Sequence, residues 1–319
     1  MNTPSVSVII PAHNAQRFLA EAIESVLAQS HPLVECIVVD DGSTDQTAEV
    51  AGRYGDRVRY LHQENAERSA ARNNGLSRAT GDYVCFLDAD DYLAPDKIAE
   101  QLAFLEAHPE YDAVYSRVCY FQDGNVRSFY SVKRPTPSGE LLSKLIYTNF
   151  ITIHAPLIRT KVARRAGGFD PALTRYEDWE FFLRLSALGA RFGFVDRTNA
   201  YVRMHAANTV GDRVGMFQAK CQVVEKFLVR HAPEVVAAGI DPGTVLAFHR
   251  ADYGRLLILN GRVEEGRSLI REACRFPIPH RRKFSFFSIA AALFGSRALV
   301  CAVTTAERLF KYRKGGVGR

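Results

Sequence analysis

Three apolar runs near the start of the chain each end abruptly in polar side chains. Residues 6–10, 36–39 and 83–87 are rich in β-branched and other apolar residues, as is typical of strands buried on both faces of a parallel sheet. Segments with helical spacing of apolar residues, such as 18–27, lie between them. This alternation predicts an α/β fold whose sheet is mostly parallel and flanked by helices. Such sheets bind ligands at the carboxyl ends of their strands.

Acidic residues gather at two of these strand ends. Asp40 and Asp41 follow the second run, and Asp88, Asp90 and Asp91 follow the third. Two ionised carboxylates about 4 Å apart repel by about 4 kcal/mol at an effective dielectric constant near 20. Mg²⁺ or Mn²⁺ would relieve that repulsion. A solvated, Asp-rich turn that caps the next helix is the alternative, and Asp91 fits that role best.

Local signals predict where several elements begin and end. Ser43 and Gln46 have the spacing of a capping box, and Pro95 suits the first turn of a helix. Residues 192–196 and 200–205 read as two separate strands, whereas 120–165 predicts a mixture of strands and loops.

Composition favours one large core or a core with a smaller domain. The chain has 319 residues, of which 47% are hydrophobic, and its six cysteines are scattered without a CxxC pair. They indicate a reducing compartment, and residues 1–7 lack the basic and apolar segments of a secretory signal. We therefore expect a cytoplasmic protein.

The C-terminal part differs in charge from the rest. Residues 262–319 carry 13 Lys or Arg against 4 Glu, a net charge of +9. The net charge of the whole chain is +6, so the residues before 262 are net acidic. Beyond residue 211 the pattern is helical, and the apolar segment 284–303 is interrupted by Arg297. Residues 276–319 are therefore expected to lie on an anionic membrane surface, with a membrane span or ordinary packing as the alternatives. Nucleic acid is not expected, because the aromatic residues follow a helical pattern.

Six motifs together resemble those of family 2 glycosyltransferases with the GT-A fold. The resemblance covers residues 5 to about 210, which predicts a catalytic domain at 1–210 and a helical region at 211–319. The motifs are VSVIIPAHN (6–14), VVDDGSTD (38–45), RNNG (72–75), FLDADD (86–91), GGFD (167–170) and EDWEFFLRL (177–185).

The resemblance implies an inverting enzyme of bacterial polysaccharide or glycan biosynthesis. Together with the expected cytoplasmic location, the basic residues 276–319 predict that it lies at the inner face of the cytoplasmic membrane. Its donor would be a nucleoside diphosphate sugar, with uridine diphosphate favoured, and its acceptor a hydroxyl of a glycan or lipid-linked glycan. Mn²⁺ or Mg²⁺ would be the cofactor. Two alternatives from other functional classes are a catalytically silent scaffold that binds sugar nucleotides and a nucleotidyltransferase. A nucleotidyltransferase is expected to carry a Gly-rich basic loop after the first strand, where this chain has the sequence PAHN at residues 11–14.

The resemblance also implies roles for individual residues. Asp178 would be the general base. Arg203, Glu177 and Trp179 would be candidates for contact with the diphosphate or acceptor. As an alternative, Glu177 would only stabilise the positive end of the dipole of the helix that it begins. An isolated His such as His205 is an ordinary core or surface residue as often as it is a metal ligand. The nucleotide would be bound by Pro11, His13, Asn14, Asp41, Arg72 and Asp88, and the metal by Asp88, Asp90 and His205.

One position departs from the family pattern. The family often has Gly two residues after the Asn that matches Asn65, and here that position is Glu67. The sequence therefore leaves open the backbone conformation and the contacts of the segment around Asn65 and Glu67.

Overall fold

The chain forms two compact units in a computed structural model. They comprise Met1–Asn208 and Thr209–Arg319. The structure describes residues 3–122, 125–130, 136–205, 212–293, 295, 296 and 299, with the backbone alone at 125–130 and 213.

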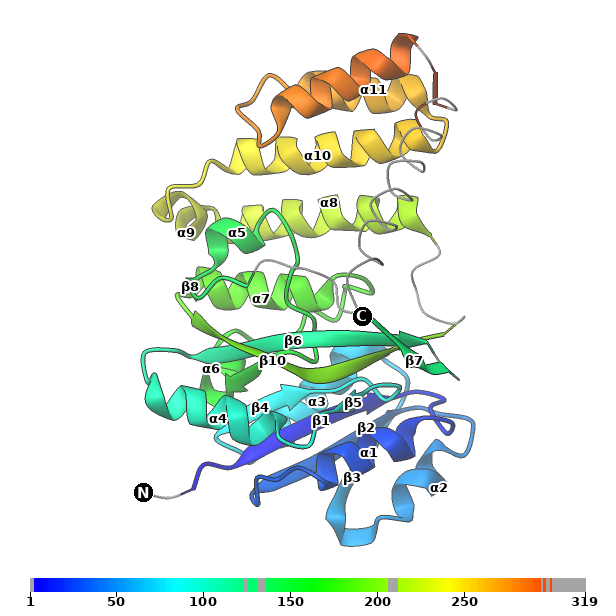
Figure 1. The fold of residues 1–319 in the computed structure, drawn as a ribbon, viewed down its shortest axis with the longest axis vertical. Helices are drawn as coiled ribbons and strands as arrows, with labels where there is room; N and C mark the ends of the chain where they lie inside the picture. Colours follow the sequence, from blue (N-terminus) through cyan, green and yellow to red (C-terminus); the bar gives the residue numbers. More distant parts are fainter. Residues whose placement is uncertain are drawn as a thin grey trace, which may run out of the picture. The chain divides into compact units, whose positions relative to one another are not determined.

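The first unit is built on one mixed sheet, in the order β3-β2-β1-β4-β9-β6-β10-β5, with β7 paired to β6 and β8 to β10. β1 pairs in parallel with both β2 and β4, and β2 pairs in parallel with β3. β9 runs antiparallel to β4 and β6, whereas β6 and β10 are parallel to each other. The strands are β1 (Val6–Ala12), β2 (Val34–Asp41), β3 (Val58–Gln63), β4 (Tyr83–Phe86), β5 (Tyr92–Leu93), β6 (Ala113–Gln122), β7 (Asn125–Tyr130), β8 (Gly139–Glu140), β9 (Leu157–Arg159) and β10 (Arg191–Met204) (Figure 1).

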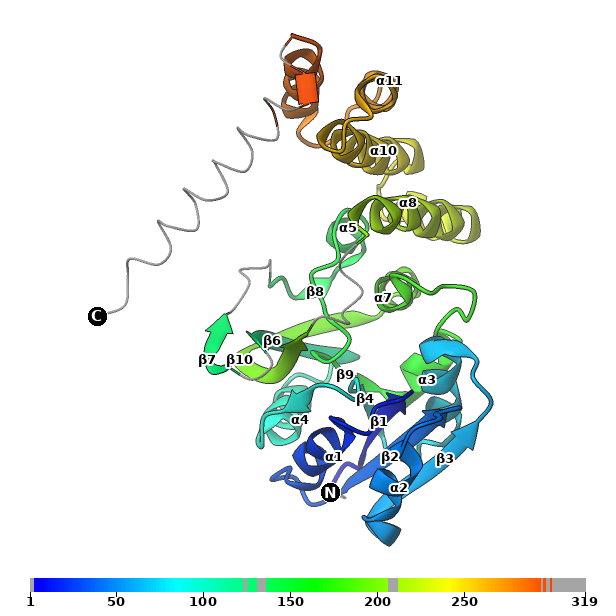
Figure 2. The same ribbon diagram turned by 90° about the vertical axis from the view of Figure 1, so that its right-hand side faces the viewer.

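Helices cover both faces of this sheet. α1 and α4 lie on one face and α3 on the other (Figure 2). α3 approaches β1 closely at Gly75, where an added Cβ would lie 2.4 Å from the side chain of Ile9. The helices are α1 (Leu19–Leu27), α2 (Thr47–Gly52), α3 (Glu67–Arg78), α4 (Lys97–Ala107), α5 (Leu142–Leu145), α6 (Thr160–Arg165) and α7 (Glu177–Ala187). This architecture confirms the predicted α/β class.

Three local predictions were wrong. The two strands expected between residues 192 and 205 form the single strand β10, whose pairing with β6 is irregular between Val195 and Ala200. Pro95 precedes the N-cap residue Asp96 and so lies before α4. No capping box forms at α2 because the helix begins at Thr47 with Gln46 as its N-cap residue, so Ser43 lies before the cap, where its hydroxyl accepts a hydrogen bond from the backbone of Asn14.

The second unit is helical, as the periodicity predicts. α10 packs against α8 and α11. A further helix covers residues 281–293 and contributes to an apolar core with α10 and α11. The other helices are α8 (Arg213–Arg230), α9 (Ala232–Ala237), α10 (Pro242–Leu259) and α11 (Val263–Ala273).

The predicted apolar segment 284–303 is described only in part. Residues 294, 297, 298 and 300–303 lie outside the described residues. In the part of the chain that the structure describes, no helix has both the length and the apolar character needed to cross a bilayer.

Candidate active site

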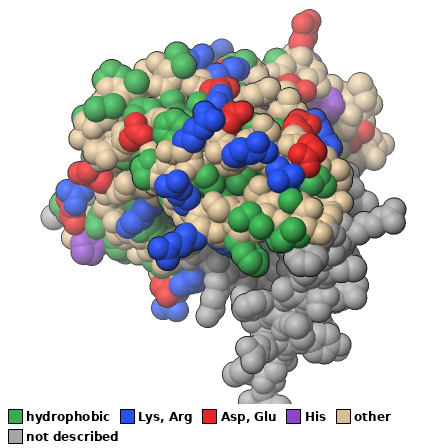
Figure 3. All heavy atoms as spheres, turned by 90° about the horizontal axis from the view of Figure 1, so that it is seen from above, with side chains coloured by type: hydrophobic (Ala, Val, Ile, Leu, Met, Phe, Trp, Pro, Cys, Tyr) green, Lys and Arg blue, Asp and Glu red, His purple; other side chains and the backbone are tan. Residues whose placement is uncertain are grey.

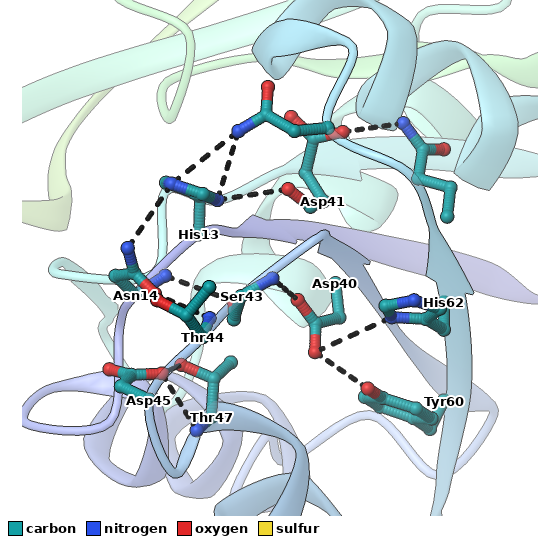
Figure 4. Close-up of polar contacts among 12 residues, drawn as sticks. His13, Asn14, Asp40, Asp41, Ser43, Thr44, Asp45, Thr47, Tyr60 and His62 are labelled. Carbon is teal, nitrogen blue, oxygen red and sulfur yellow. Dashed lines mark hydrogen bonds and ion pairs between the residues drawn. The ribbon is translucent and has the colours of Figure 1, made fainter.

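The carboxyl ends of β1 and β2 meet in one polar cluster, which contains His13, Asn14 and Asp41 (Figure 4). The Asp41 carboxylate accepts hydrogen bonds from the Gln63 side chain at 2.7 Å and from the backbone of Ala66 at 2.9 Å. His13 Nδ1 lies 2.9 Å from the Asp41 carbonyl oxygen. Asp41 is thereby fixed by groups from β3 and from the loop before α3, beside the ring of His13.

Asn14 joins the two strand ends. Its φ of 49° places it in the left-handed region, which Asn tolerates better than most residues. Its side-chain oxygen accepts from the backbone of Thr44 at 2.8 Å, and its own backbone donates to the Ser43 hydroxyl at 2.9 Å. Pro11 lies inside β1, paired with Val39. The loops after β1 and β2 therefore form one hydrogen-bonded rim.

Asp40 differs from its neighbour Asp41. Its carboxylate accepts from the Tyr60 hydroxyl at 2.6 Å and from the Ser43 backbone at 2.9 Å. Burial would raise the pKa of Asp40, but these hydrogen bonds hold it below its usual range. Asp40 thus braces the loop from inside the protein.

Glu67 adopts a backbone conformation that suits glycine. Its φ is 71°, in the left-handed region that costs an L-residue about 1–2 kcal/mol. This is the position at which the family pattern often has Gly. Glu67 therefore adopts a conformation that glycine would adopt without strain, at the cost of local strain.

Arg72 bridges two acidic groups from distant parts of the chain. It projects from α3, and its side chain is 1% exposed. Nη2 donates to Asp88 at 2.6 Å, and Nη1 donates to Glu177 at 2.9 Å. Burial would raise the pKa of Asp88, but Arg72 and His154 hold it well below its usual range. Arg72 therefore connects the acidic end of β4 with the start of α7.

His154 completes the cluster from a loop before β9. Its Nε2 lies 2.7 Å from Asp91 Oδ2 and 3.2 Å from Asp88 Oδ2. Burial would lower the pKa of His154, but the two carboxylates raise it well above its usual value. Asp91 is itself buried, which raises its pKa, and its Oδ1 accepts from the backbone of Arg203 at 2.7 Å. The backbone of Asp91 closes a turn as predicted, since its N–H donates to the Asp88 carbonyl oxygen at 3.1 Å, but its side chain is buried and not solvated.

Asp90 points to a different partner. Its Oδ2 lies 2.9 Å from His205 Nε2, beyond the end of β10. Two ligands of one Mg²⁺, each about 2.1 Å from the ion and at right angles, lie about 3 Å apart. The Asp90 and His205 atoms fit this spacing. Asp88, Asp91 and His154 also offer ligand atoms, all within 4.8 Å of one another, but there the His154 and Arg72 cations already balance the carboxylates.

Arg203 lies next to this pair but inside the protein. Its guanidinium packs between the rings of Phe18 and Phe121, 4.8 Å and 4.7 Å from their centroids. Nε donates to the Asp90 carbonyl oxygen at 2.9 Å, and Nη2 bonds to Glu21. Arg203 therefore fixes the backbone of Asp90. The sequence suggested instead that it contacts the diphosphate or acceptor.

Asp178 begins α7 beside Glu177. Asn149 Nδ2 lies 3.5 Å from one of its carboxylate oxygens, and the other accepts from the backbone of Trp179 at 2.6 Å. Burial and the negative charge of Glu177 raise the pKa of Asp178 to about 6, against the opposing charge of Arg72. A carboxylate with such a pKa is a better proton acceptor near neutral pH than an ordinary Asp.

Trp179 serves the packing of α7. It is fully buried, and its indole N–H donates to the Leu145 carbonyl oxygen at 2.8 Å. The sequence suggested that Trp179 contacts the acceptor, but its burial prevents such a contact in this structure.

The structure thus brings most of the predicted site residues into two connected groups. His13, Asn14 and Asp41 form the first; Arg72, Asp88 and Glu177, with Asp178 next in sequence, form the second. Sequence reasoning missed His154 and Asn149, because both lie in the stretch whose strands and loops gave no periodic signal.

The chain also matches known proteins. Residues 7–166 match the model of the family described as glycosyl transferase family 2. An uncharacterized glycosyltransferase of Rickettsia prowazekii is 30% identical over 222 residues, which cover 68% of this chain and 69% of the relative. The chain belongs to glycosyl transferase family 2. It is therefore a glycosyltransferase, as the motifs predict.

Other relatives of this glycosyltransferase differ in length. One from Rickettsia felis is 40% identical over 152 residues, yet the match spans only 25% of its length. A Bacillus subtilis protein provisionally named as a teichuronic acid biosynthesis glycosyltransferase is 44% identical over 106 residues, 32% of this chain and 42% of the relative.

Solved structures share the fold of the glycosyltransferase. Staphylococcus aureus TarS 1–349 in complex with UDP-GlcNAc has a TM-score of 0.65 at 19% identity, over 99% of this chain and 93% of that chain. The mannosyltransferase PcManGT from Pyrobaculum calidifontis, in complex with GDP-Man and Mn²⁺, has a TM-score of 0.60 at 20% identity, over 94% of this chain and 84% of that chain. These likenesses confirm the predicted GT-A fold.

Proposed function

We propose that this glycosyltransferase moves a sugar from a nucleoside diphosphate sugar, with uridine diphosphate favoured, to a hydroxyl of a glycan or lipid-linked acceptor, with inversion at the anomeric carbon. One observation carries the proposal. Arg72 holds Asp88 and Glu177 at 2.6 and 2.9 Å, so the strand end that suits a donor diphosphate and the helix that carries Asp178 are parts of one site.

The donor would lie along the strand ends. Asp41 and His13 would receive the base, because Gln63 and Ala66 hold the Asp41 carboxylate in place and His13 Nδ1 contacts the Asp41 carbonyl oxygen. The ribose would lie toward Asp88. TarS and PcManGT were solved with UDP-GlcNAc and GDP-Man, so structures of this fold accept both bases. Uridine is favoured by the family resemblance.

Asp90 and His205 would hold Mn²⁺ or Mg²⁺, since their ligand atoms are 2.9 Å apart and Arg203 fixes the Asp90 backbone. Bound there, the ion would neutralise the charge that develops on the leaving diphosphate. Arg203 and Asp91 would act by positioning. Asp88 would keep its charge through Arg72 and His154.

Asp178 would accept the proton of the acceptor hydroxyl. The acceptor oxygen then forms its bond to the anomeric carbon as the bond from that carbon to the diphosphate oxygen breaks, and the nucleoside diphosphate leaves. General-base catalysis of this kind contributes about 10²- to 10⁴-fold to the rate. The raised pKa of Asp178 suits this role.

A thermal-shift screen tests the donor and metal assignment. Uridine, guanosine and deoxythymidine diphosphate sugars are added with Mn²⁺, with Mg²⁺ or with a chelator. A donor at about 100 times its Kd stabilises the protein by about 2.7 kcal/mol. We expect the largest rise in Tm with a uridine diphosphate sugar and Mn²⁺, and its loss in the chelator.

Two variants complete the screen. Asp90→Ala should lose most of the metal-dependent rise, whereas Asp56→Ala, at an exposed position away from the cluster, should keep it. An equal rise with metal and with chelator would refute the metal site. A larger rise with another base would refute the choice of uridine while leaving sugar transfer in place.

A further inference from the structure

The helix at residues 281–293 has apolar side chains on two opposite faces. Its inner face contributes Phe284, Phe287 and Ala291 to the core shared with α10 and α11. Its outer face carries Phe286, Ile289 and Leu293, which are 74%, 59% and 71% exposed. A helix in a water-soluble unit normally presents polar residues on the face away from its core.

The three exposed residues form one stripe. Positions 286, 289 and 293 are three and four residues apart, so they share one side of the helix over two turns. We call them the outer stripe. Single exposed apolar residues need no explanation, but an aligned set of large ones marks a surface that binds something apolar.

Basic residues lie at one end of the outer stripe. Between residues 274 and 293 there are four Lys or Arg and no Asp or Glu. Arg281, Arg282 and Lys283 are exposed in the first turn of the helix. Arg282 is four residues before Phe286 and therefore lies on the same face. The surface seen from the α11 side carries Lys and Arg side chains among hydrophobic and acidic ones (Figure 3).

We call residues 281–283 the basic turn, and the stability of the helix does not explain their charge. The amino end of a helix carries partial positive charge, so a cation there costs about 0.3–1 kcal/mol. Three consecutive cations oppose the helix dipole. Their placement instead suits attraction to something negative outside the protein.

The charge pattern also separates the candidate partners. A second copy joined through the same stripe would bring no Asp or Glu to the contact, because residues 274–293 contain none, and so offers no partner for the basic residues. Residues 300–319 of the chain itself carry five Lys or Arg and one Glu, and so have the same sign. An anionic bilayer offers both an apolar layer for the outer stripe and negative headgroups for the basic turn.

We propose that the outer stripe and basic turn of helix 281–293 dock this glycosyltransferase on an anionic lipid surface, with the helix lying in the plane of the interface. The proposal does not depend on the donor or acceptor. It concerns the second unit alone.

Vesicle flotation of the full chain tests it. The probes are vesicles of phosphatidylcholine alone and vesicles that also contain phosphatidylglycerol. The chain should bind only the second kind, and added salt should weaken the binding. Each basic residue near such a surface contributes about 1 kcal/mol, so replacing Arg281, Arg282 and Lys283 with Gln should weaken binding about a hundredfold.

Two further variants isolate the outer stripe. Phe286→Ser, Ile289→Ser and Leu293→Ser together should reduce binding at least about tenfold, since burial of these side chains drives insertion. Val229→Ser with Val236→Ser removes exposed apolar residues, 83% and 59% exposed, from α8 and α9 and should change nothing. An unchanged Tm in every variant shows that the unit remains folded.

Three results would overturn the proposal. They are equal binding to both kinds of vesicle, or to neither; binding that the stripe variant leaves intact; and a dimer in solution that the stripe variant dissociates. The last result would assign the surface to a second copy.

Discussion

Replacement of Arg72 by Met should weaken both the fold and the general base. The side chain is 1% exposed and pairs with Asp88 at 2.6 Å and Glu177 at 2.9 Å. Removing one partner of a buried ion pair typically costs 3–5 kcal/mol. Asp88 is 29% exposed and keeps His154, so we expect a loss near the lower end, about 3 kcal/mol.

The same change should alter the pH dependence of transfer. Asp178 accepts a proton only when ionised, so the rate of the wild type should fall as the pH drops through about 6. Arg72 lowers the pKa of Asp178, and without it the pKa rises further. The acid limb of the rate profile should therefore move to higher pH in Arg72→Met.

Urea unfolding and kcat against pH measure the two effects. Arg78→Met, at an exposed position on the same helix, is the matched control and should change neither. Arg72→Lys should recover only part of the loss, because one ammonium group lacks the fork that reaches both acids. Adding Glu177→Gln to Arg72→Met should restore part of the lost stability, because Glu177 is then no longer a buried charge without a partner, whereas Asp88 still lacks Arg72. Equal stability of Arg72→Met and Arg78→Met, with the same acid limb, would refute this reasoning.

Two smaller changes test particular residues. Glu67→Gly should raise the free energy of unfolding by about 1 kcal/mol because φ is 71°, whereas Glu67→Ala should give no such gain. Urea unfolding measures both variants, and an equal change in their free energies of unfolding would exclude backbone strain at Glu67. Trp179→Phe removes the donor to the Leu145 carbonyl oxygen, so it should cost about 1–3 kcal/mol while the KM for the acceptor stays the same; a large rise in that KM with unchanged stability would make Trp179 an acceptor contact.

The parallel half of the sheet could be predicted because its signals are local. β1, β2 and β4 contain mostly apolar runs with polar residues at or just after their ends, and the rule on strand ends then places Asp41 and Asp88 at one edge. Periodicity likewise found α10 and α11. The same reasoning predicted that acids at these ends form a site.

The rest depends on contacts between distant residues. His154 reaches Asp91 from more than 60 positions along the chain, out of a stretch without regular spacing. Arg203 was a candidate for contact with the diphosphate or acceptor, but packing between two aromatic rings turns it inward. Burial of Asp91 was hidden for the same reason, since a single sequence does not state which face of a turn is covered.

The most direct test of the proposed mechanism is Asp178→Asn, measured for donor binding and for sugar transfer on the same protein. Asn keeps the size of the side chain but cannot take the acceptor proton. The account predicts a donor-induced rise in Tm like that of the wild type and a kcat at least about 10²-fold lower, with Asp56→Asn unchanged in both. Turnover near that of the wild type would contradict the assignment of Asp178 as the base.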